Sequence, residues 1–179
     1  MTSLAQGAAG LALVMSFALL CPHQLGAALR LLLVQAAAVA VAAACRSRFL
    51  IAGGELILGA IAAPILVRRL LDHLAIPHTT LPVGGAKLAV IAGAVLALLA
   101  MPMGTLGLPL AVVLLAILMV ATRRHPVMQL VGFLALQNGL VLAAAESGWR
   151  EAPAVVCPFV PFLVGAALRL RAPMPRATL

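Results

Sequence analysis

A few polar side chains stand inside long apolar stretches of this sequence, and they are the groups with which the chain could do chemistry. They are Arg30, Gln35, Glu55, Gln137 and Asn138. A polar or charged group within the hydrocarbon of a membrane is costly, so each is a candidate for a proton or ion path. Amides donate and accept hydrogen bonds without the desolvation cost of an ion. We therefore interpret the three amides first as hydrogen-bonding glue between helices.

Glu55 is the acid of this set, and it lies about two helical turns inside an apolar run that begins at Phe49. Two interpretations stay open. Glu55 is a site for a proton or a cation, or it is an acid near the membrane surface that water reaches or that pairs with Arg46 or Arg48. Arg30 lies near a predicted helix end, where its long side chain can extend to the lipid headgroups. We do not expect it to line a pathway.

The other reactive residue types form no recognisable site. His73 and His78 lie near Asp72 in the longest loop, but their spacing fits no standard metal motif. The cysteines are Cys21, Cys45 and Cys157. Their odd number and the lack of C-x-x-C spacing indicate neither a disulfide framework nor a metal site. The sequence also lacks a phosphate-binding glycine loop and a nucleophile elbow, so we expect no metal, no cofactor and no independent enzyme active site.

The elements that must position these groups are membrane-spanning helices. Hydrophobic residues make up 65% of the chain and charged residues 9%, with a mean hydropathy of +1.21, whereas soluble domains carry about 25% charged residues. The apolar runs are Leu4–Leu20, Leu25–Ala44, Phe49–Leu71, Ala86–Met101, Leu106–Thr122, Val127–Ala145 and Ala152–Leu170. Each is of helical membrane-crossing length. The sequence therefore predicts an all-α, polytopic membrane protein of about seven transmembrane helices.

The weakest division is the break at Pro102–Pro109. A single helix across it would be roughly 35 residues long, which is too long for one crossing, so we predict two helices joined by a tight turn. The chain then divides into a four-helix segment, residues 1–101, and a three-helix segment, residues 102–179. The first run lacks a positively charged start, and we interpret it as a retained helix rather than a cleaved signal peptide.

Basic residues predict the orientation. With the N-terminus outside, the cytoplasmic set is Arg30, Arg68, Arg69, Lys87, Arg123, Arg124, Arg169, Arg171 and Arg176, and the outer set is Arg46, Arg48 and Arg150. This asymmetry predicts a periplasmic N-terminus and a cytoplasmic C-terminus in a bacterial inner membrane. An outer turn with Glu146, Trp149, Arg150 and Glu151 is interpreted as an interfacial anchor. The net charge of +8 is scattered among apolar runs without interleaved aromatics, so we expect the lipid bilayer and no nucleic acid as a partner.

Small residues at helical spacing predict close helix packing. One stripe is Glu55, Gly59, Ala62 and Ala63, and another is Gly132, Leu136, Gly139 and Ala143. The stripes alone do not say whether the neighbouring helix belongs to this chain or to another subunit. Kinks are predicted at Pro64, Pro153, Pro158 and Pro161.

The segment Met128–Leu140, MQLVGFLALQNGL, resembles the signature helix of the hydrogenase-4 component E family. Leu29–Leu31 with Gln35 is similar to the family's second helix, and Ala63–Leu70 to the end of its third. The length and the seven-helix layout also fit. Members of this family are membrane subunits of group 4 hydrogenase, formate hydrogenlyase-type and related complexes. The last three predicted helices also resemble the K subunit of respiratory complex I and the C subunit of multisubunit cation/proton antiporters.

The chain departs from this family where protons would be handled. The glutamate that normally precedes the Asn of the sixth helix is replaced by Gln137, and the lysine expected shortly before Pro64 is replaced by Gly59. The last predicted helix has no acid from Ala152 to Leu168. An amide cannot exchange a proton at neutral pH as a carboxylate can. The resemblance implies the family's place in an assembly and not its proton transfer at these positions.

From the resemblance we expect a non-catalytic subunit of a complex I-like or group 4 hydrogenase-like redox complex, respiratory or formate-linked, packed against antiporter-like and other membrane-arm subunits that carry out proton translocation. One alternative is a subunit that conducts protons or cations with Glu55 and trapped water. Another is a self-contained small transporter. The sequence shows no internal repeat and no charges lining a midplane site, which disfavours the transporter.

Overall fold

A computed structural model of the chain describes residues 2–21, 24–57, 59, 65, 86–123 and 126–147, which are nearly all helical. The elements are α1 (Thr2–Leu20), α2 (Leu25–Cys45), α3 (Phe49–Glu55), α5 (Ala86–Ala100), the 3-10 helix η2 (Met101–Leu106), α6 (Gly107–Thr122) and α7 (Pro126–Ser147). The ends of α1, α2, α5, α6 and α7 agree with the predicted runs to within two residues.

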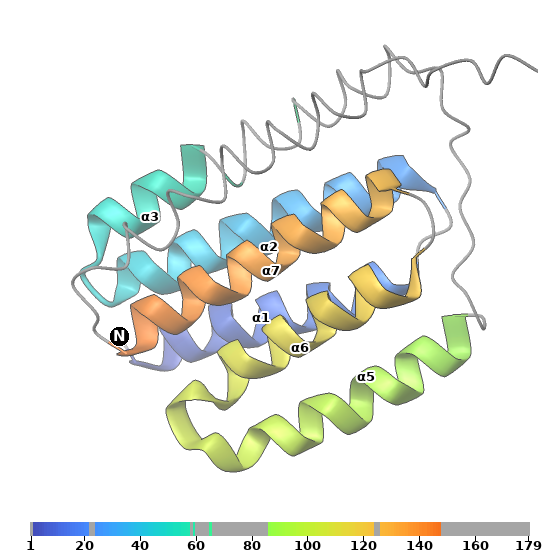
Figure 1. Cartoon of the computed structure of the whole chain (residues 1–179). Helices are drawn as coiled ribbons and strands as arrows, with labels where there is room; N and C mark the ends of the chain where they lie inside the picture. Colours follow the sequence, from blue (N-terminus) through green and yellow to red (C-terminus); the bar gives the residue numbers. More distant parts are fainter. Residues whose placement is uncertain are drawn as a thin grey trace, which may run out of the picture.

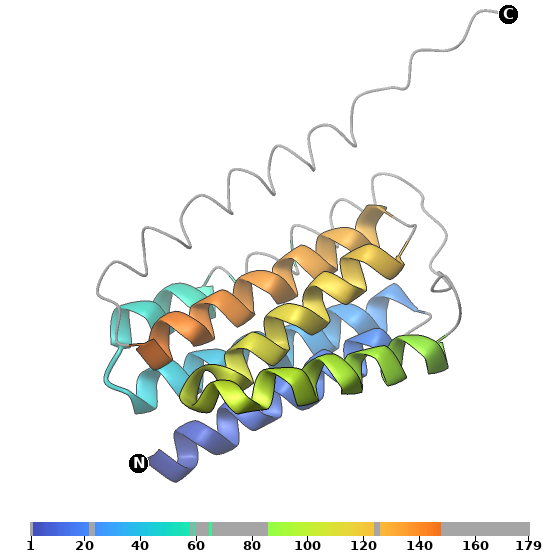
Figure 2. The ribbon, with the colours of Figure 1, turned by 60° about the horizontal axis from the view of Figure 1, so that its bottom comes forward.

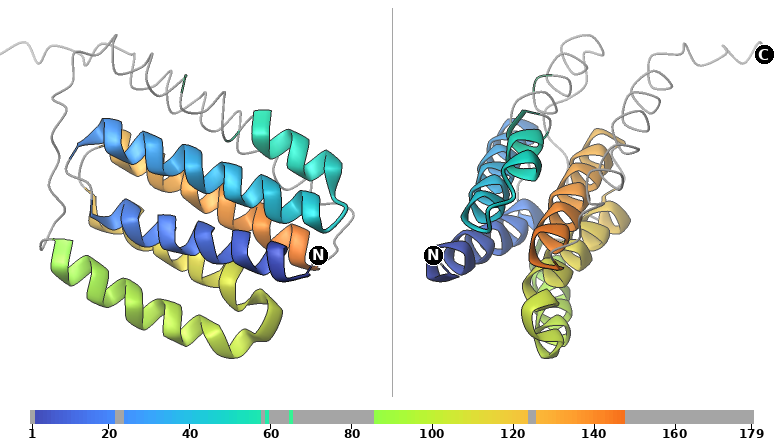
Figure 3. Two further views of the ribbon diagram at one scale, coloured as in Figure 1. Left: turned by 180° about the vertical axis from the view of Figure 1, so that it is seen from behind. Right: turned by 90° about the vertical axis from the view of Figure 1, so that its left-hand side faces the viewer.

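The helices are arranged in two layers. The right-hand view of Figure 3 shows α3, α2 and α1 side by side in one layer and α7, α6 and α5 in the other. Across the layers, α2 packs on α7 and α1 packs on α6. Short connections make α1 and α2 antiparallel neighbours, and likewise α6 and α7 (Figure 1). α3 packs on α2, and α5 packs on α6, so that α3 and α5 lie at opposite edges of the bundle.

The two largest apolar clusters of the described part lie between the layers. The first lies toward the end of the bundle where α1 ends and α2 begins, and it includes Leu20, Leu25, Met119 and Met128. The second lies toward the opposite end, and it includes Ala9, Val39, Val112 and Leu142. Each cluster takes residues from α1, α2, α6 and α7.

Four described stretches are long and apolar enough to cross a membrane. They are Ser3–Leu20, Leu25–Cys45, Lys87–Thr122 and Val127–Ser147. The third is 36 residues long but is folded back on itself at η2, so that α5 and α6 run side by side (Figure 2). Gly104 has a φ of 62° in this turn, a conformation that glycine adopts without steric cost. The tight turn predicted within Pro102–Pro109 is therefore confirmed.

The fold is that of a helical membrane protein. Seven crossings and the orientation of the termini stay predictions from the sequence. The run Phe49–Leu71 is described as α-helix to Glu55, and the last run, Ala152–Leu170, lies outside the described residues. The predicted kink sites also lie outside them: Pro64, Pro153, Pro158 and Pro161.

The small-residue stripe of α7 is a contact surface within the chain. A Cβ atom at Gly132 would lie 2.7 Å from Val120 Cγ2, and one at Gly139 would lie 2.8 Å from Val113 Cγ2. Real Cβ atoms do not approach so closely, so the backbones of α6 and α7 are nearer than a side chain at these positions would permit. The prediction of close packing is confirmed for α7, and its neighbour is α6.

Candidate functional site

Three of the predicted polar residues, Gln35, Glu55 and Asn138, come together inside the bundle, and Ser16 joins them from α1. All four are buried. The Ser16 hydroxyl donates to the carbonyl of Ala12 at 2.9 Å, and Gln35 Nε2 donates to Ser16 Oγ at 2.7 Å. Asn138 Nδ2 donates to Gln35 Oε1 at 3.2 Å. We call Ser16, Gln35, Asn138 and Glu55 the polar chain, because they link α1, α2, α7 and α3 in that order.

The polar chain separates the two apolar clusters. On α1, α2 and α7, the polar residue falls between the segment that contributes to one cluster and the segment that contributes to the other. Gln35 is at the middle of the 21-residue α2, and Asn138 is near the middle of the 22-residue α7. An unpaired buried amide would cost about 1–3 kcal/mol. The hydrogen bonds between helices remove much of that cost.

Glu55 reaches the polar chain through Asn138. With Asn138 Nδ2 toward Gln35, the side-chain oxygen of Asn138 lies 2.6 Å from Glu55 Oε1. Two oxygens at this distance form a hydrogen bond only when one of them carries a proton. With the Asn138 amide turned over, its nitrogen instead donates to Glu55 Oε1 at 2.6 Å and to the carbonyl of Leu134 at 3.2 Å. Glu55 Oε1 therefore meets an acceptor in one orientation of the Asn138 amide, which suits a protonated carboxyl group, and a donor in the other, which suits an ionised one.

Gly59 provides the space for the Glu55 carboxyl group. A Cβ atom at position 59 would collide with Glu55 Oε1 and would lie 2.9 Å from Glu55 Cδ, with Ala36 Cβ at 3.4 Å. The backbone is π-helical at Leu56, Ile57 and Gly59, and such turns are frequent at functional sites. In the predicted small-residue stripe, Gly59 thus makes room for the carboxyl group of Glu55. The other members of the stripe, Ala62 and Ala63, lie outside the described residues.

The other two predicted residues stay apart from the polar chain. Arg30 is exposed on α2. Gln137 is buried, and its Oε1 has no hydrogen-bond partner in the described part of the chain. Successive helix positions point about 100° apart, so Gln137 and Asn138 cannot face the same neighbour although they are adjacent in sequence.

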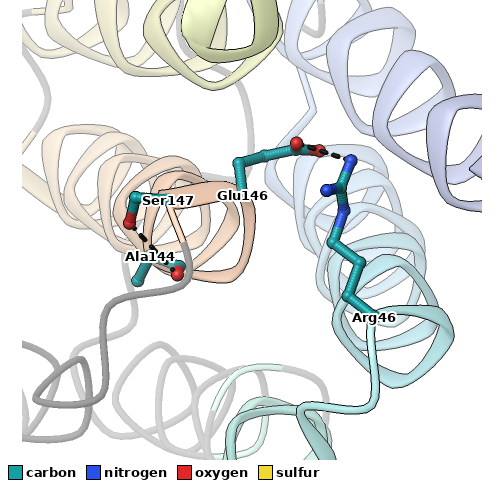
Figure 4. Close-up of polar contacts among 4 residues, drawn as sticks. All are labelled: Arg46, Ala144, Glu146 and Ser147. Carbon is teal, nitrogen blue, oxygen red and sulfur yellow. Dashed lines mark hydrogen bonds and ion pairs between the residues drawn. The ribbon is translucent and has the colours of Figure 1, made fainter.

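An ion pair joins α2 to α7 at the end of the bundle where α3 begins. Arg46 Nη2 lies 2.5 Å from a carboxylate oxygen of Glu146, and the two side chains point toward each other in Figure 4. Arg46, considered from the sequence as a partner of Glu55, thus pairs with Glu146. The rest of the predicted interfacial anchor lies outside the described residues: Trp149, Arg150 and Glu151.

Two buried, hydrogen-bonded polar side chains were not identified from the sequence as candidates, Ser16 and Arg123. Arg123 was expected as a loop charge, but it is buried and donates from Nη2 to the carbonyl of Leu20 at 2.7 Å. Gln129 Nε2 donates to the Arg123 carbonyl at 2.8 Å. Burial lowers the pKa of the Arg123 guanidinium, and Cys21 opposes this effect, but arginine keeps its charge. A cation on the last carbonyls of α1 stabilises that helix end and ties it to α6.

Within the described part, the cysteines Cys21 and Cys45 are free, and no group of three or more His, Cys, Asp or Glu side chains could hold a metal. The predictions for Cys157 and for the loop with Asp72, His73 and His78 fall on residues outside that part.

No protein-family model, no curated protein and no solved structure matches this chain. The resemblance to the hydrogenase-4 component E family therefore stays a prediction from the sequence. The class that the fold itself defines is a helical membrane protein with a buried polar chain.

Proposed function

We propose that this chain is a non-catalytic membrane subunit of a complex I-like or group 4 hydrogenase-like redox complex in the bacterial inner membrane, packed against antiporter-like subunits. The observation that carries the proposal is the sequence of Met128–Leu140. This segment lies in α7, where 72% of the candidate span is buried, against at most 50% of the other three. The residues that resemble the family's signature helix therefore belong to the most enclosed helix described.

The outer face of α5 offers a surface for a neighbouring subunit. Leu88, Ile91, Val95 and Leu98 recur at helical spacing and are each more than half exposed. Because nearly all described residues lie in helices, the contacts that this part of the chain makes with other subunits come largely from such faces. In this proposal a helix of an antiporter-like subunit covers the α5 face, and lipid covers the exposed side chains of α1.

Co-purification tests the proposed assembly. The full chain, tagged at its C-terminus and extracted in mild detergent, should bring down larger multi-helix subunits. Leu98→Trp, which changes the α5 face, should reduce this recovery. Val14→Trp, at a position of α1 that is 58% exposed, is the matched control and should not. Recovery of a monodisperse, ion-transporting monomer or dimer would instead favour the self-contained transporter.

The proposed orientation is testable separately. Arg30, Lys87 and Arg123 lie toward one end of the bundle and Arg46 and Arg48 toward the other, since consecutive helices alternate in direction. We propose that the first end is cytoplasmic. In a variant without native cysteines, a cysteine at the N-terminus should react with an impermeant reagent from outside, and one at the C-terminus should not. Labelling of both termini from one side would refute the odd number of crossings.

A second candidate function is conduction of protons or cations by this subunit itself. It is favoured by the burial of Glu55 beside Asn138. In reconstituted vesicles, Glu55→Gln should then abolish ion translocation while the complex stays assembled and its redox activity measurable. If the subunit is structural, Glu55→Gln and Gln137→Leu should both leave translocation per assembled complex unchanged.

A further inference from the structure

We propose that Glu55 binds and releases a proton inside the bundle, and that Asn138, Gln35 and Ser16 reverse the direction of their hydrogen bonds each time it does so. This proposal goes beyond the assembly role and does not depend on it, because all the groups involved belong to this chain. It rests on the 2.6 Å separation between Glu55 Oε1 and the Asn138 amide and on the unbroken contacts from there to α1.

With a proton on Glu55, every hydrogen bond runs from α3 toward α1. The Glu55 hydroxyl donates to the Asn138 oxygen, and Asn138 Nδ2 donates to Gln35 Oε1. Gln35 Nε2 donates to Ser16 Oγ, and the Ser16 hydroxyl donates to the Ala12 carbonyl. In this order each contact from Glu55 to Ala12 joins one donor to one acceptor.

Without that proton the same order fails at its first step, because two oxygens without a proton between them repel each other. The Asn138 amide must turn so that its nitrogen donates to Glu55 Oε1. Its oxygen then lies 3.2 Å from Gln35 Oε1, so that two acceptors face each other and the Gln35 amide must turn as well. Gln35 then presents its oxygen to Ser16, and the Ser16 hydroxyl must leave the Ala12 carbonyl to donate to it.

Few other charged groups on the neighbouring elements lie where they could bind the proton in place of Glu55. The helices packed against α3 are α2 and α7. Their described charged side chains are the exposed Arg30, and Arg46 and Glu146, which pair with each other. Arg48 precedes α3 at its opposite end, and Cys45 is half-buried at the end of α2. The second carboxyl oxygen of Glu55 is buried and has no hydrogen-bond partner in the described part.

The polar chain changes its hydrogen bonds in response to the proton on Glu55, but it does not conduct that proton. An amide N–H does not pass a proton on at neutral pH, so the proton must reach Glu55 from water and return to water. Only the O–H bond of Glu55 forms and breaks, while the amides and the Ser16 hydroxyl change orientation. The result is a change in the bonding of the Ala12 carbonyl on α1 that depends on a proton bound at α3.

Infrared difference spectroscopy of the full chain in lipid nanodiscs tests this proposal. Raising the pH should remove a protonated-carboxyl C=O band and, with the same midpoint, shift the side-chain amide bands of isotope-labelled Asn and Gln. Glu55→Gln should abolish both changes. Glu146→Gln, which alters the ion-paired acid of α7, should leave both in place.

The variant Gly59→Ala tests whether the amide bands depend on the position of the Glu55 carboxyl group. Its Cβ atom would displace the Glu55 carboxyl, so the amide bands should no longer follow the carboxyl band. Gly53→Ala, where a Cβ atom meets nothing within 4 Å, is the matched control and should behave as the wild type. Three results would overturn the proposal: no carboxyl band that depends on Glu55, a Glu55 band that stays unchanged at every pH at which the bundle is folded, or a titrating carboxyl whose amide bands stay still.

Discussion

The two faces of α7 hold their neighbours in different ways. Toward α6, Gly132 and Gly139 let the backbones approach until a Cβ atom would not fit. Toward α2 and α3, Asn138 contacts Gln35 and Glu55 through hydrogen bonds between buried side chains. We refer to these as the glycine face and the amide face.

Both kinds of contact are explained by the lipid that surrounds the helices. Lipid is as apolar as the helices, so burial of apolar surface does not drive helices together in a membrane; packing and hydrogen bonds do. The glycine face depends on shape and should tolerate no added atom. The amide face depends on pairing and should tolerate changes of size better than the loss of a donor or acceptor.

The largest expected effect is on the glycine face. In Gly139→Leu, the new side chain meets Val113 Cγ2, Val112 Cγ1 and the Val113 backbone nitrogen, and the free energy of unfolding should fall by about 3 kcal/mol. Titration with SDS in mixed micelles measures it. Gly10→Leu on α1, where a Cβ atom meets nothing within 4 Å, is the control. An equal loss in both variants would mean that close approach to α6 is not the cause.

A smaller loss is expected on the amide face. Gln35→Leu and Asn138→Leu should each lower the free energy of unfolding by about 0.6–1.7 kcal/mol, between the average and the largest contribution of hydrogen bonds between membrane helices. In a double-mutant cycle the two losses should not add, because both substitutions remove the same bond. Strict additivity would show that the two amides do not interact.

The ion pair at the end of α7 should contribute less to the free energy of unfolding than the hydrogen bonds of the amide face do. Arg46 is about a third exposed, with 31% of its side chain accessible, so solvent screens its attraction to Glu146. Arg46→Gln should cost about 0.5 kcal/mol at low salt, and the cost should shrink as salt rises. A cost that does not respond to salt would point to packing of the Arg46 side chain and not to its charge.

The smallest effect should come from Gln137, which borders the amide face without joining it. Its Oε1 is buried and has no partner in the described part, so Gln137→Leu should leave the unfolding free energy of the isolated chain unchanged or slightly raised. If a partner subunit bonds Gln137, the variant should lower the yield of assembled complex instead. A loss in the isolated chain as large as that of Asn138→Leu would contradict this assignment.

Most helix boundaries could be predicted because lipid imposes a strong constraint on composition. A span must be apolar along its whole length, so the short breaks between runs mark where α1, α2, α5, α6 and α7 begin and end. The turn at Gly104 was predictable for the same reason, since an uninterrupted helix would be too long to cross once.

The candidate site was predictable residue by residue but not as a group. Gln35, Glu55 and Asn138 stand out because polar side chains are rare in such runs. Ser16 did not, because a serine that bonds its own helix four residues back is ordinary in an apolar helix. Arg123 looked like a loop charge, because a sequence does not show that another helix ends beside it with open carbonyls.

The sequence by itself determined that this chain is a bundle of apolar helices, which residues in it are polar, and that α7 carries a stripe of small residues, since these follow from composition and helical spacing. Only the tertiary structure decided which helix meets each face. Gln137 and Asn138 are adjacent amides of the same chemistry, yet Asn138 joins Gln35 and Glu55 while the Gln137 oxygen has no partner in the described part. The physical reason is direction: neighbouring positions on a helix point to different sides, and the packing of α2, α3 and α6 around α7 determines what each side meets.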